Sequence, residues 1–179
     1  MNKKLLALAL ALGLSLSLTA CGGGNDAPAG SENTTPQESA QAGGGNTADT
    51  FVFATADGVE VAVNEDMADV LAALGQEQSY FEAESCAFEG LDKTYTYPGF
   101  VITTRPDGDK DYVNSIRLTD DTVSTGEGVY IGSSESDVTT AYGESGSDTE
   151  GVLGYTAGDV ALNFILEDGV VTSIEYLPA

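Results

Sequence analysis

The sequence contains no histidine, only two cysteines and only six lysine or arginine residues among 179. Without histidine, neither Ser-His-Asp nor Cys-His catalytic arrangements can be built, and zinc sites with imidazole ligands are excluded. A phosphate-binding loop is absent too, because the Gly-Gly-Gly runs at 22–24 and 43–45 have no Lys-Ser or Lys-Thr after them. These absences leave no nucleophile–base pair, and we expect the protein not to be an enzyme.

Basic residues are also scarce. Six of them stand against 29 aspartates and glutamates, for a formal net charge of −23. Nucleic acid is excluded as a natural partner, because binding requires cationic side chains that displace counterions from phosphates. Anionic lipid headgroups are repelled as well. A charge of this size favours solubility and attracts cations or basic patches on partner proteins.

The N-terminus has the pattern of a secretory signal. Residues 1–4 contain two lysines, and residues 5–18 form an apolar run. The run is shorter than the ~20 apolar residues that a membrane-spanning helix needs. It ends in Leu18-Thr19-Ala20-Cys21, which resembles the lipobox of bacterial lipoproteins. The resemblance implies that residues 1–20 are removed as a signal peptide and that Cys21 carries a covalent diacylglycerol.

Lipidation would place the protein at the cell membrane, lipid-anchored and facing the extracytoplasmic side. Two or more acyl chains give stable anchoring, whereas one gives marginal binding. Loss of Lys3 and Lys4 with the signal peptide leaves four basic against 29 acidic residues, a net charge of −25. Cys86 would then be the remaining thiol, which excludes an internal disulfide. Its small and aromatic neighbours predict a buried core residue.

Residues 21–49 differ in composition from the rest of the chain. After Cys21 they contain no aromatic residue and no aliphatic residue larger than alanine. Such a segment buries too little apolar surface to offset its ordering entropy, so we predict a disordered linker. By the scaling of flexible linkers its typical span is roughly 30 Å. Residues 50–179 have the length of one compact domain.

Two segments of this domain align without a gap. Residues 61–75 match 129–143: both have an extended apolar lead-in, a polar cap, Asp-Val and a glycine stop. Further on, Val-Asn-Ser-Ile at 113–116 matches Val-Thr-Ser-Ile at 171–174. Because an internal repeat decides the fold, we predict two repeat units, over about 59–122 and 127–179.

Each unit is predicted to begin with a helix. In the first unit, apolar residues at i, i+3, i+4 and i+7 within 67–74 define one helical face. Asn64 is the expected cap, and Gly75 is the expected stop. In the second unit, Ser-x-x-Asp at 134–137 has the pattern of a capping box, and Gly143 is the stop.

After each helix the apolar pattern changes to a period of two, which is typical of strands. Pro98-Gly99, the loop within 106–110 and Asp168-Gly169 predict hairpin turns between these strands. The predicted fold class is therefore α+β, with two helix-then-antiparallel-meander repeats forming one domain after a signal peptide and a disordered tether.

The layout and the Asp-Val-x-x-x-Tyr-Gly element at 137–143 resemble the tandem units of β-lactamase-inhibitor-protein-like and BamE/SmpA-like extracytoplasmic lipoproteins. The stretch 85–97 is similar to uncharacterised lipoproteins of Gram-positive gut bacteria. The resemblance covers most of 59–179. It implies that the helices pack on one face of a continuous sheet and that the open face binds other proteins. No inhibitory residue can be carried over from that family.

The strongest candidate for a metal site is a run of alternating aspartates, Asp107, Asp109 and Asp111. Alternating carboxylates on a tight loop can present oxygens to Ca²⁺. The EF-hand pattern further needs a glycine and an acid where this sequence has Tyr112 and Leu118. A polar hairpin turn explains the segment without a metal.

Aromatic residues offer a second candidate, because Tyr95, Tyr97 and Tyr112 could form an exposed interaction surface. On strands, half of such residues belong to the core. The leading hypothesis is a lipid-anchored binding protein of the cell envelope with a protein partner at the cell surface. The alternative is a surface lipoprotein that binds calcium or a small solute. No cofactor other than the covalent lipid is expected.

Overall fold

The computed structural model describes residues 49–179. The expected signal peptide, Cys21 and the linker up to residue 48 lie outside the described residues. Within the described range, no helix is long and apolar enough to cross a membrane.

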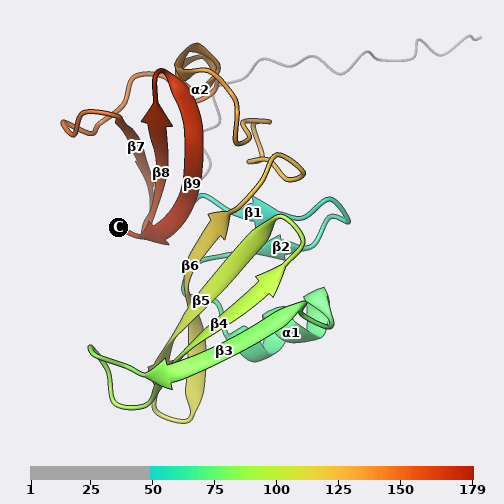
Figure 1. Cartoon of the computed structure of the whole chain (residues 1–179). Coiled ribbons are helices and arrows are strands. Elements are labelled where there is room, and N and C mark those ends of the chain that lie inside the picture. Colours follow the sequence, from blue (N-terminus) through green and yellow to red (C-terminus); the bar gives the residue numbers. More distant parts are fainter. Residues whose placement is uncertain (1–48) are drawn as a thin grey trace, which may run out of the picture. The chain divides into compact units, whose positions relative to one another are not determined.

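Residues 49–179 form two helices and nine strands (Figure 1). In chain order these are β1 (Phe53–Ala54), β2 (Glu60–Val61), α1 (Met67–Leu74), β3 (Ser79–Glu84), β4 (Leu91–Tyr97), β5 (Phe100–Asp107), β6 (Lys110–Leu118), α2 (Glu135–Tyr142), β7 (Val152–Ala157), β8 (Val160–Glu167) and β9 (Val170–Pro178). The predicted α+β class is confirmed. The sequence pattern located β4, β5, β6, β8 and β9 but did not identify β3 or β7.

Seven of the strands form one antiparallel sheet in the order β3-β4-β5-β6-β9-β8-β7, and β1 pairs separately with β2. The meander β3–β6 meets the meander β7–β9 where β6 lies beside β9. Three residue pairs make this junction, and Leu118 opposite Ile174 is one of them. The backbone hydrogen bonds of one sheet therefore connect both meanders.

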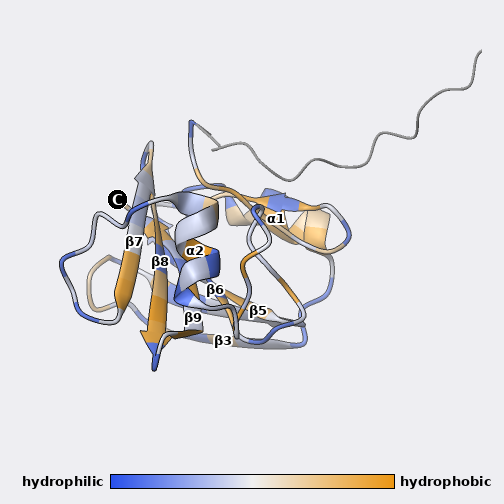
Figure 2. Cartoon of the chain, turned by 90° about the horizontal axis from the view of Figure 1, so that it is seen from above, coloured by the Kyte–Doolittle hydropathy of each residue, from blue (hydrophilic) through white to orange (hydrophobic). Residues whose placement is uncertain are grey.

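Both helices contribute to the same buried cluster as the sheet. Figure 2 shows in orange the apolar residues of the strands and of α1. Met67 and Val70 of α1 and Val138 of α2 are buried there, together with alternating residues of the strands. Alternation places every second strand residue on one face, so one face of the sheet is the core face. Its large, fully buried side chains include Ile102 and Phe164.

The helix ends follow local chemistry. Ser134 and Asp137 form the predicted capping box at the start of α2, and Gly75 and Gly143 end the two helices at positive φ. The prediction that Asn64 caps α1 is wrong. The cap is Asp66, which accepts a hydrogen bond from the Ala68 amide at 3.0 Å, because Asn64 has a left-handed φ of 68° and lies before the helix.

The hairpin turns occur where they were predicted. Asp168 and Gly169 both have positive φ, as a type I′ turn between β8 and β9 requires. Cys86, in contrast, does not lie in the core. It is exposed because the loop between β3 and β4 projects from the end of these strands that lies away from α1 (Figure 1). Its apolar neighbour Phe88 is exposed too.

Candidate functional site

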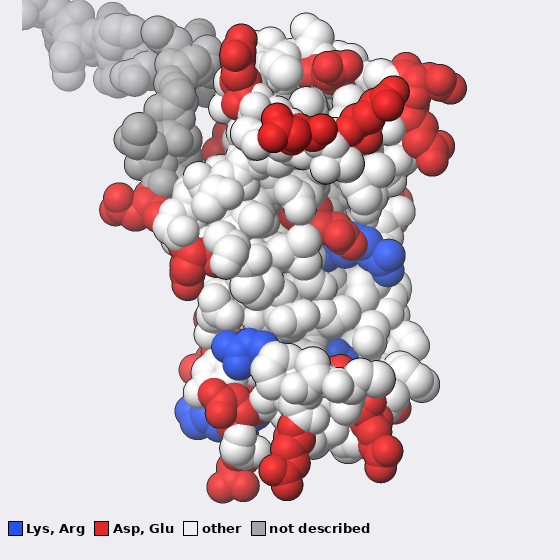
Figure 3. Space-filling model, turned by 90° about the vertical axis from the view of Figure 1, so that its left-hand side faces the viewer, with Lys and Arg blue, Asp and Glu red and all other residues white. Residues whose placement is uncertain are grey.

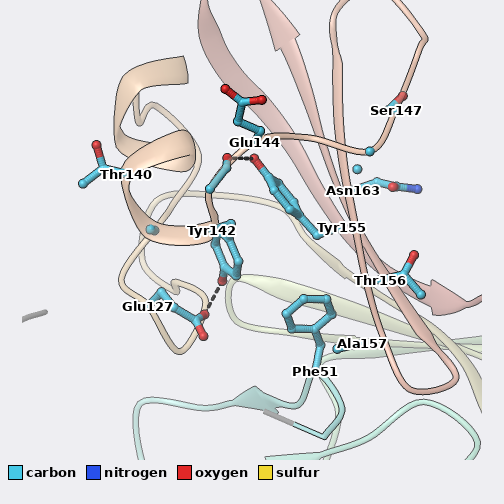
Figure 4. Close-up of a pocket in the computed structure, with 14 residues that line it drawn as sticks. Phe51, Glu127, Thr140, Tyr142, Glu144, Ser147, Tyr155, Thr156, Ala157 and Asn163 are labelled. Carbon is cyan, nitrogen blue, oxygen red and sulfur yellow. Dashed lines mark hydrogen bonds between the residues drawn. The ribbon is translucent and has the colours of Figure 1, made fainter. Parts of the chain in front are cut away.

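A groove of about 950 Å³ opens beside the C-terminal end of α2. Its walls are the end of this helix, the loop after it, strand β7 and the segment before β1 (Figure 4). The lining consists of Phe51, Glu127, residues 140–144, 146–147 and 154–157, and Asn163. No short stretch of sequence contains this set, so only the fold brings it together.

Three aromatic rings form a connected wall of the groove (Figure 4). The centroids of Phe51 and Tyr142 are 5.9 Å apart in an edge-to-face arrangement. Those of Tyr142 and Tyr155 are 5.2 Å apart. Tyr142 also packs on the fully buried Phe164, which ties this wall to the core. Aromatic pairs at these separations stabilise one another beyond their burial.

The hydroxyl groups of both tyrosines are engaged within the wall. Tyr142 donates a hydrogen bond to the Glu127 carboxylate, and Tyr155 donates one to the Gly143 carbonyl at 3.0 Å. Burial and then the bond to Glu127 raise the pKa of Tyr142 above its usual 10. Burial also raises the pKa of Tyr155. Both phenols are therefore protonated at neutral pH, and their bonds hold the rings in place.

The loop after α2 closes one end of the groove by hydrogen bonding to β7. The Gly146 amide donates to the Gly154 carbonyl at 2.9 Å, and the Gly154 amide donates to the Ser145 hydroxyl at 2.8 Å. A Cβ at Gly154 would lie 3.1 Å from Asn163 Oδ1 and 3.3 Å from the Ser147 Cβ. A glycine at this position thus lets the loop approach the sheet closely.

The part of the chain that forms the groove is uniformly acidic. Residues 119–179 contain aspartates and glutamates but no lysine or arginine. On the face that Figure 3 shows, the upper end of the molecule carries acidic groups, whereas basic groups lie nearer the middle and the lower end. Glu127 and Glu144 line the groove itself. The electrostatic potential there favours cationic ligands.

The four basic residues at positions 49–179 lie on strands β4–β6, and each has a partner. Lys93 pairs with Asp111 at 2.6 Å, and Lys110 pairs with Asp66 at 2.6 Å. Arg117 lies 3.9 Å from Glu175. The fourth, Arg105, stacks over the ring of Tyr112, with 5.4 Å to the centroid. None of these cations reaches the lining of the groove.

The alternating aspartates do not converge on one point. β5 ends at Asp107 opposite Lys110, and Pro106 lies opposite Asp111. Since successive strand residues point to opposite faces, Asp107 and Asp111 lie on opposite faces of the hairpin, and Asp109 is in its two-residue turn. Asp111 instead pairs with Lys93. No three His, Cys, Asp or Glu side chains are placed to hold a metal ion anywhere in 49–179.

The tyrosines predicted as a possible interaction surface are mostly internal. Tyr95 and Tyr97 are only 7% and 5% exposed, because both lie on the core face of β4. They therefore do not form an exposed patch, which corrects that prediction. Tyr112 is half-buried beneath Arg105. The tyrosines that contribute to the groove are Tyr142 and Tyr155 instead.

The open face of the sheet, which the family resemblance implies as a binding face, is largely polar at its centre. Thr103 and Ser115 share a hydrogen bond of 2.7 Å there, and Arg117 faces Glu175 across β6 and β9. The exposed apolar side chains on this face lie toward its two ends: Phe81 on β3 and Ile165 on β8. Its centre therefore lacks the apolar cluster that is typical of an interface core.

Sequence reasoning did not identify the groove. Tyr142 was noted only as part of the Asp-Val-x-x-x-Tyr-Gly element at 137–143, and Phe51 and Tyr155 were not singled out. The one sequence signal that points to this region is the absence of lysine and arginine after Arg117. The rest of the site depends on contacts between residues far apart in the chain.

No family model matches the chain, and no curated protein matches it. Among solved structures, the chain is similar to the crystal structure of YjgB, a DUF4309 family protein from Bacillus subtilis subsp. subtilis strain 168. The identity is 14%, the match covers 64% of this chain and 79% of that one, and the TM-score is 0.41.

Proposed function

We propose that this protein is a lipid-anchored binding protein of the cell envelope whose groove beside α2 takes a basic segment of a partner protein. The observation that carries the proposal is an aromatic wall in a part of the chain that has no basic residue. The acidic charge of the whole chain attracts such a partner, and the groove gives the contact a defined position.

The chemistry of the groove suits the side chains of lysine and arginine. Cations bind over the faces of tyrosine and phenylalanine rings at about 0.5–2 kcal/mol per contact, and Phe51, Tyr142 and Tyr155 offer such rings. Glu127 and Glu144 supply negative charge at the same place. The hydroxyl and amide groups of Ser147, Thr156 and Asn163 add partners for a peptide backbone.

A binding role is also supported by the groups that the groove contains. Its hydroxyl residues, Thr140, Ser147 and Thr156, have no imidazole beside them, because the chain has no histidine. Its two half-buried tyrosines are protonated at neutral pH, because the usual pKa of a phenol is about 10 and burial raises it further. Such a lining provides recognition but no activated nucleophile.

The anchor rests on the sequence of residues 1–21. The basic start, the apolar run and Leu18-Thr19-Ala20-Cys21 agree in position and composition with a lipoprotein signal. A lipid at Cys21 and a linker up to residue 49 would hold the domain at the outer side of the membrane with room to reach a partner. The resemblance to tandem-unit extracytoplasmic lipoproteins supports the same location.

We also infer that 59–122 and 127–179 are two copies of one unit. Corresponding hydrogen bonds support this inference: the Asn64 amide donates to Val113 O at 2.8 Å, and the Gly132 amide donates to Val171 O at 2.9 Å. The two donors occupy aligned positions in the repeated segments 61–75 and 129–143. The two acceptors occupy aligned positions in 113–116 and 171–174. The register shifts within β5–β6 and β8–β9 occupy comparable places in the two meanders.

A peptide titration with matched charge variants tests the groove. A short lysine-rich peptide is added to the purified protein, and binding is followed by calorimetry. Glu144→Gln should weaken binding several-fold, whereas Glu167→Gln should leave it nearly unchanged. Both residues are exposed and lie in the acidic half, but Glu167 lies at the β8–β9 turn, away from the groove. Equal weakening by both variants would show general charge attraction and refute a groove site.

Detergent partitioning tests the anchor. The wild-type protein from its host membrane should enter the detergent phase, and Cys21→Ser should remain in the aqueous phase or keep its signal peptide. Two attached acyl chains give stable membrane binding, which the variant cannot form. Partitioning of Cys21→Ser into detergent at the wild-type level would contradict lipidation at this residue.

A further inference from the structure

Strand β3 forms one end of the seven-stranded sheet, and no other strand of the described part of the chain pairs with its outer side. All six of its residues are exposed. In Figure 1 it runs along the border of the first meander. An edge strand of this length presents a row of backbone amides and carbonyls to solvent.

The register shows which backbone groups are on the open side. The Ser85 amide donates to the Gly90 carbonyl at 3.0 Å, which continues the β3–β4 ladder by one pair. In an antiparallel ladder, hydrogen-bonded pairs alternate with pairs whose groups point outward. Ser79, Phe81 and Ala83 therefore bond to β4. The backbone groups of Tyr80, Glu82 and Glu84 point to the open edge.

The opposite end of the sheet is protected in a way that β3 is not. There, the loop 145–149 covers part of β7: Gly146 donates to Gly154, and Val152 donates to the Thr149 carbonyl at 3.1 Å. Within residues 49–179 no such loop pairs with the outer side of β3, and the strand contains no proline or lysine. Its pairing with β4 has no bulge. Proline, lysine and bulges are the usual devices that block edge pairing.

The side chains on this edge define what kind of strand fits. Phe81 is 65% exposed on the open face of the sheet, and Glu82 and Glu84 lie on the other face. The segment 76–92 contains five acidic residues and no lysine or arginine. An incoming strand therefore needs apolar residues on the side of Phe81 and basic residues on the side of the glutamates.

We propose that the open edge of β3 takes an extended basic segment of a partner protein as an added strand. Backbone bonds to Tyr80, Glu82 and Glu84 supply affinity, and alternating side chains supply specificity. A second copy of this chain is a poor occupant, because its own β3 carries the same glutamates and like charges repel across paired strands. This surface is separate from the groove beside α2 and does not depend on the proposed function.

Hydrogen exchange of the purified full chain tests the edge directly. In the free protein the amides of Tyr80, Glu82 and Glu84 should exchange quickly, whereas those of Phe81 and Ala83 should be protected. A ten-residue peptide that alternates lysine and valine should slow exchange at the three open positions. A peptide of the same composition with its lysines in one block should not. Protection without peptide, together with a dimer in light scattering, would identify a second copy as the occupant and overturn the proposal.

A proline substitution separates backbone pairing from charge. Glu82→Pro removes one outward amide, and proline is tolerated at a position where the N–H faces solvent. It should weaken binding of the alternating peptide by about tenfold, the upper range for one backbone hydrogen bond. Glu82→Ala, which loses the same carboxylate and its bond to Tyr80, keeps the amide and should weaken binding less.

Circular dichroism of both variants verifies that the fold is retained. Equal loss in Glu82→Pro and Glu82→Ala would show that only charge attracts the peptide and would refute strand addition. If Glu82→Pro unfolds, the hydrogen-exchange pattern decides alone: absence of protection at the three amides with the alternating peptide refutes the proposal. Glu144→Gln should leave this binding unchanged, so failure of the groove and failure of the edge are distinguishable.

Discussion

The two meanders of the sheet use the same local devices but differ at their outer borders. Each helix ends at a glycine of positive φ, 74° at Gly75 and 85° at Gly143. In each, a tyrosine hydroxyl from the neighbouring strand bonds to that glycine carbonyl: Tyr97 at 3.3 Å and Tyr155 at 3.0 Å. The two meanders differ in their outermost strand. β3 lies outside β4 in the first meander, whereas no described strand lies outside β7 in the second.

This difference accounts for both candidate surfaces. In the first meander, β3 pairs with β4 and becomes the outermost strand. No described strand pairs with the outer side of β3, so its outward backbone groups are open. Where the second meander stops at β7, a loop covers only part of the strand, and residues 154–157 line an open groove. The basic residues are distributed unequally as well: all four at positions 49–179 lie on β4–β6. The two meanders thus present different surfaces because their borders differ.

The largest effect is expected where the two meanders join. Leu118 is 1% exposed and lies opposite Ile174 at the β6–β9 junction. Leu118→Ala should lower the free energy of unfolding by about 2–5 kcal/mol, because it leaves a cavity in a shared core. Urea titrations followed by tyrosine fluorescence and by circular dichroism should shift together. Two separate transitions would show that the meanders unfold independently. Ile165→Ala, at an exposed site, is the control.

The helix-ending glycines should respond alike in both halves. Gly75 and Gly143 have ψ of −151° and −154°, a region open essentially to glycine. Alanine at either position should cost about 1–3 kcal/mol, although nothing lies within 4 Å of the added Cβ. Gly126→Ala, also without neighbours, should change stability by less than about 0.5 kcal/mol. A large loss of stability at one glycine and none at the other would show that the two helix ends are not equivalent.

The helix caps should differ in their response to salt. Ser134→Ala should cost about 1 kcal/mol at any ionic strength, because a neutral hydroxyl is lost. Asp66→Ala should lower the melting temperature more at low salt than at high salt, because Lys110 is paired with this carboxylate. Thermal melts at two salt concentrations measure both. Salt-independent loss in Asp66→Ala would show that only its capping bond matters.

The same cap gives a prediction for acid. The hydrogen bond from Lys110 lowers the pKa of Asp66 below its usual 3.8. A carboxylate with a depressed pKa in the folded state contributes stability above its usual value, and the contribution is lost as pH falls through the folded pKa. Wild-type protein and Asp66→Ala should therefore approach each other in stability below about pH 3.8. A constant gap down to pH 2 would contradict this assignment.

The effect that is smallest at neutral pH concerns Tyr142. Burial, followed by the bond to Glu127, raises the pKa of Tyr142 above 10. The unfolded chain then loses its phenolic proton first, so this contribution is complete below pH 10 and declines as pH rises beyond it. Tyr142→Phe should show a smaller loss of stability between pH 8 and 10.5 than the wild type. The position aligned with it in α1 is Leu74, which does not titrate.

The elements that the sequence predicted correctly are those governed by neighbours in the chain. The capping box at Ser134 and the turn at Asp168-Gly169 depend on a few adjacent residues, so their patterns are visible in the sequence. β3 was missed because all its residues are exposed, and a strand that buries neither face has no apolar alternation to detect. Asn64 was predicted to be the cap because asparagine is a common capping residue and lies just before the helix. In the structure, Asp66 makes the capping bond.

By itself, the sequence determined the α+β class, the two helix stops, the hairpin turns and the acidic charge, because each depends on local conformation or on composition. Tertiary structure decided which residues share a surface. Tyr95 and Tyr97 became core, and Cys86 became exposed. Phe51, Tyr142 and Tyr155 came together as one wall. Burial and contact at these positions depend on how distant strands pair, and the sheet order is not encoded in any single segment.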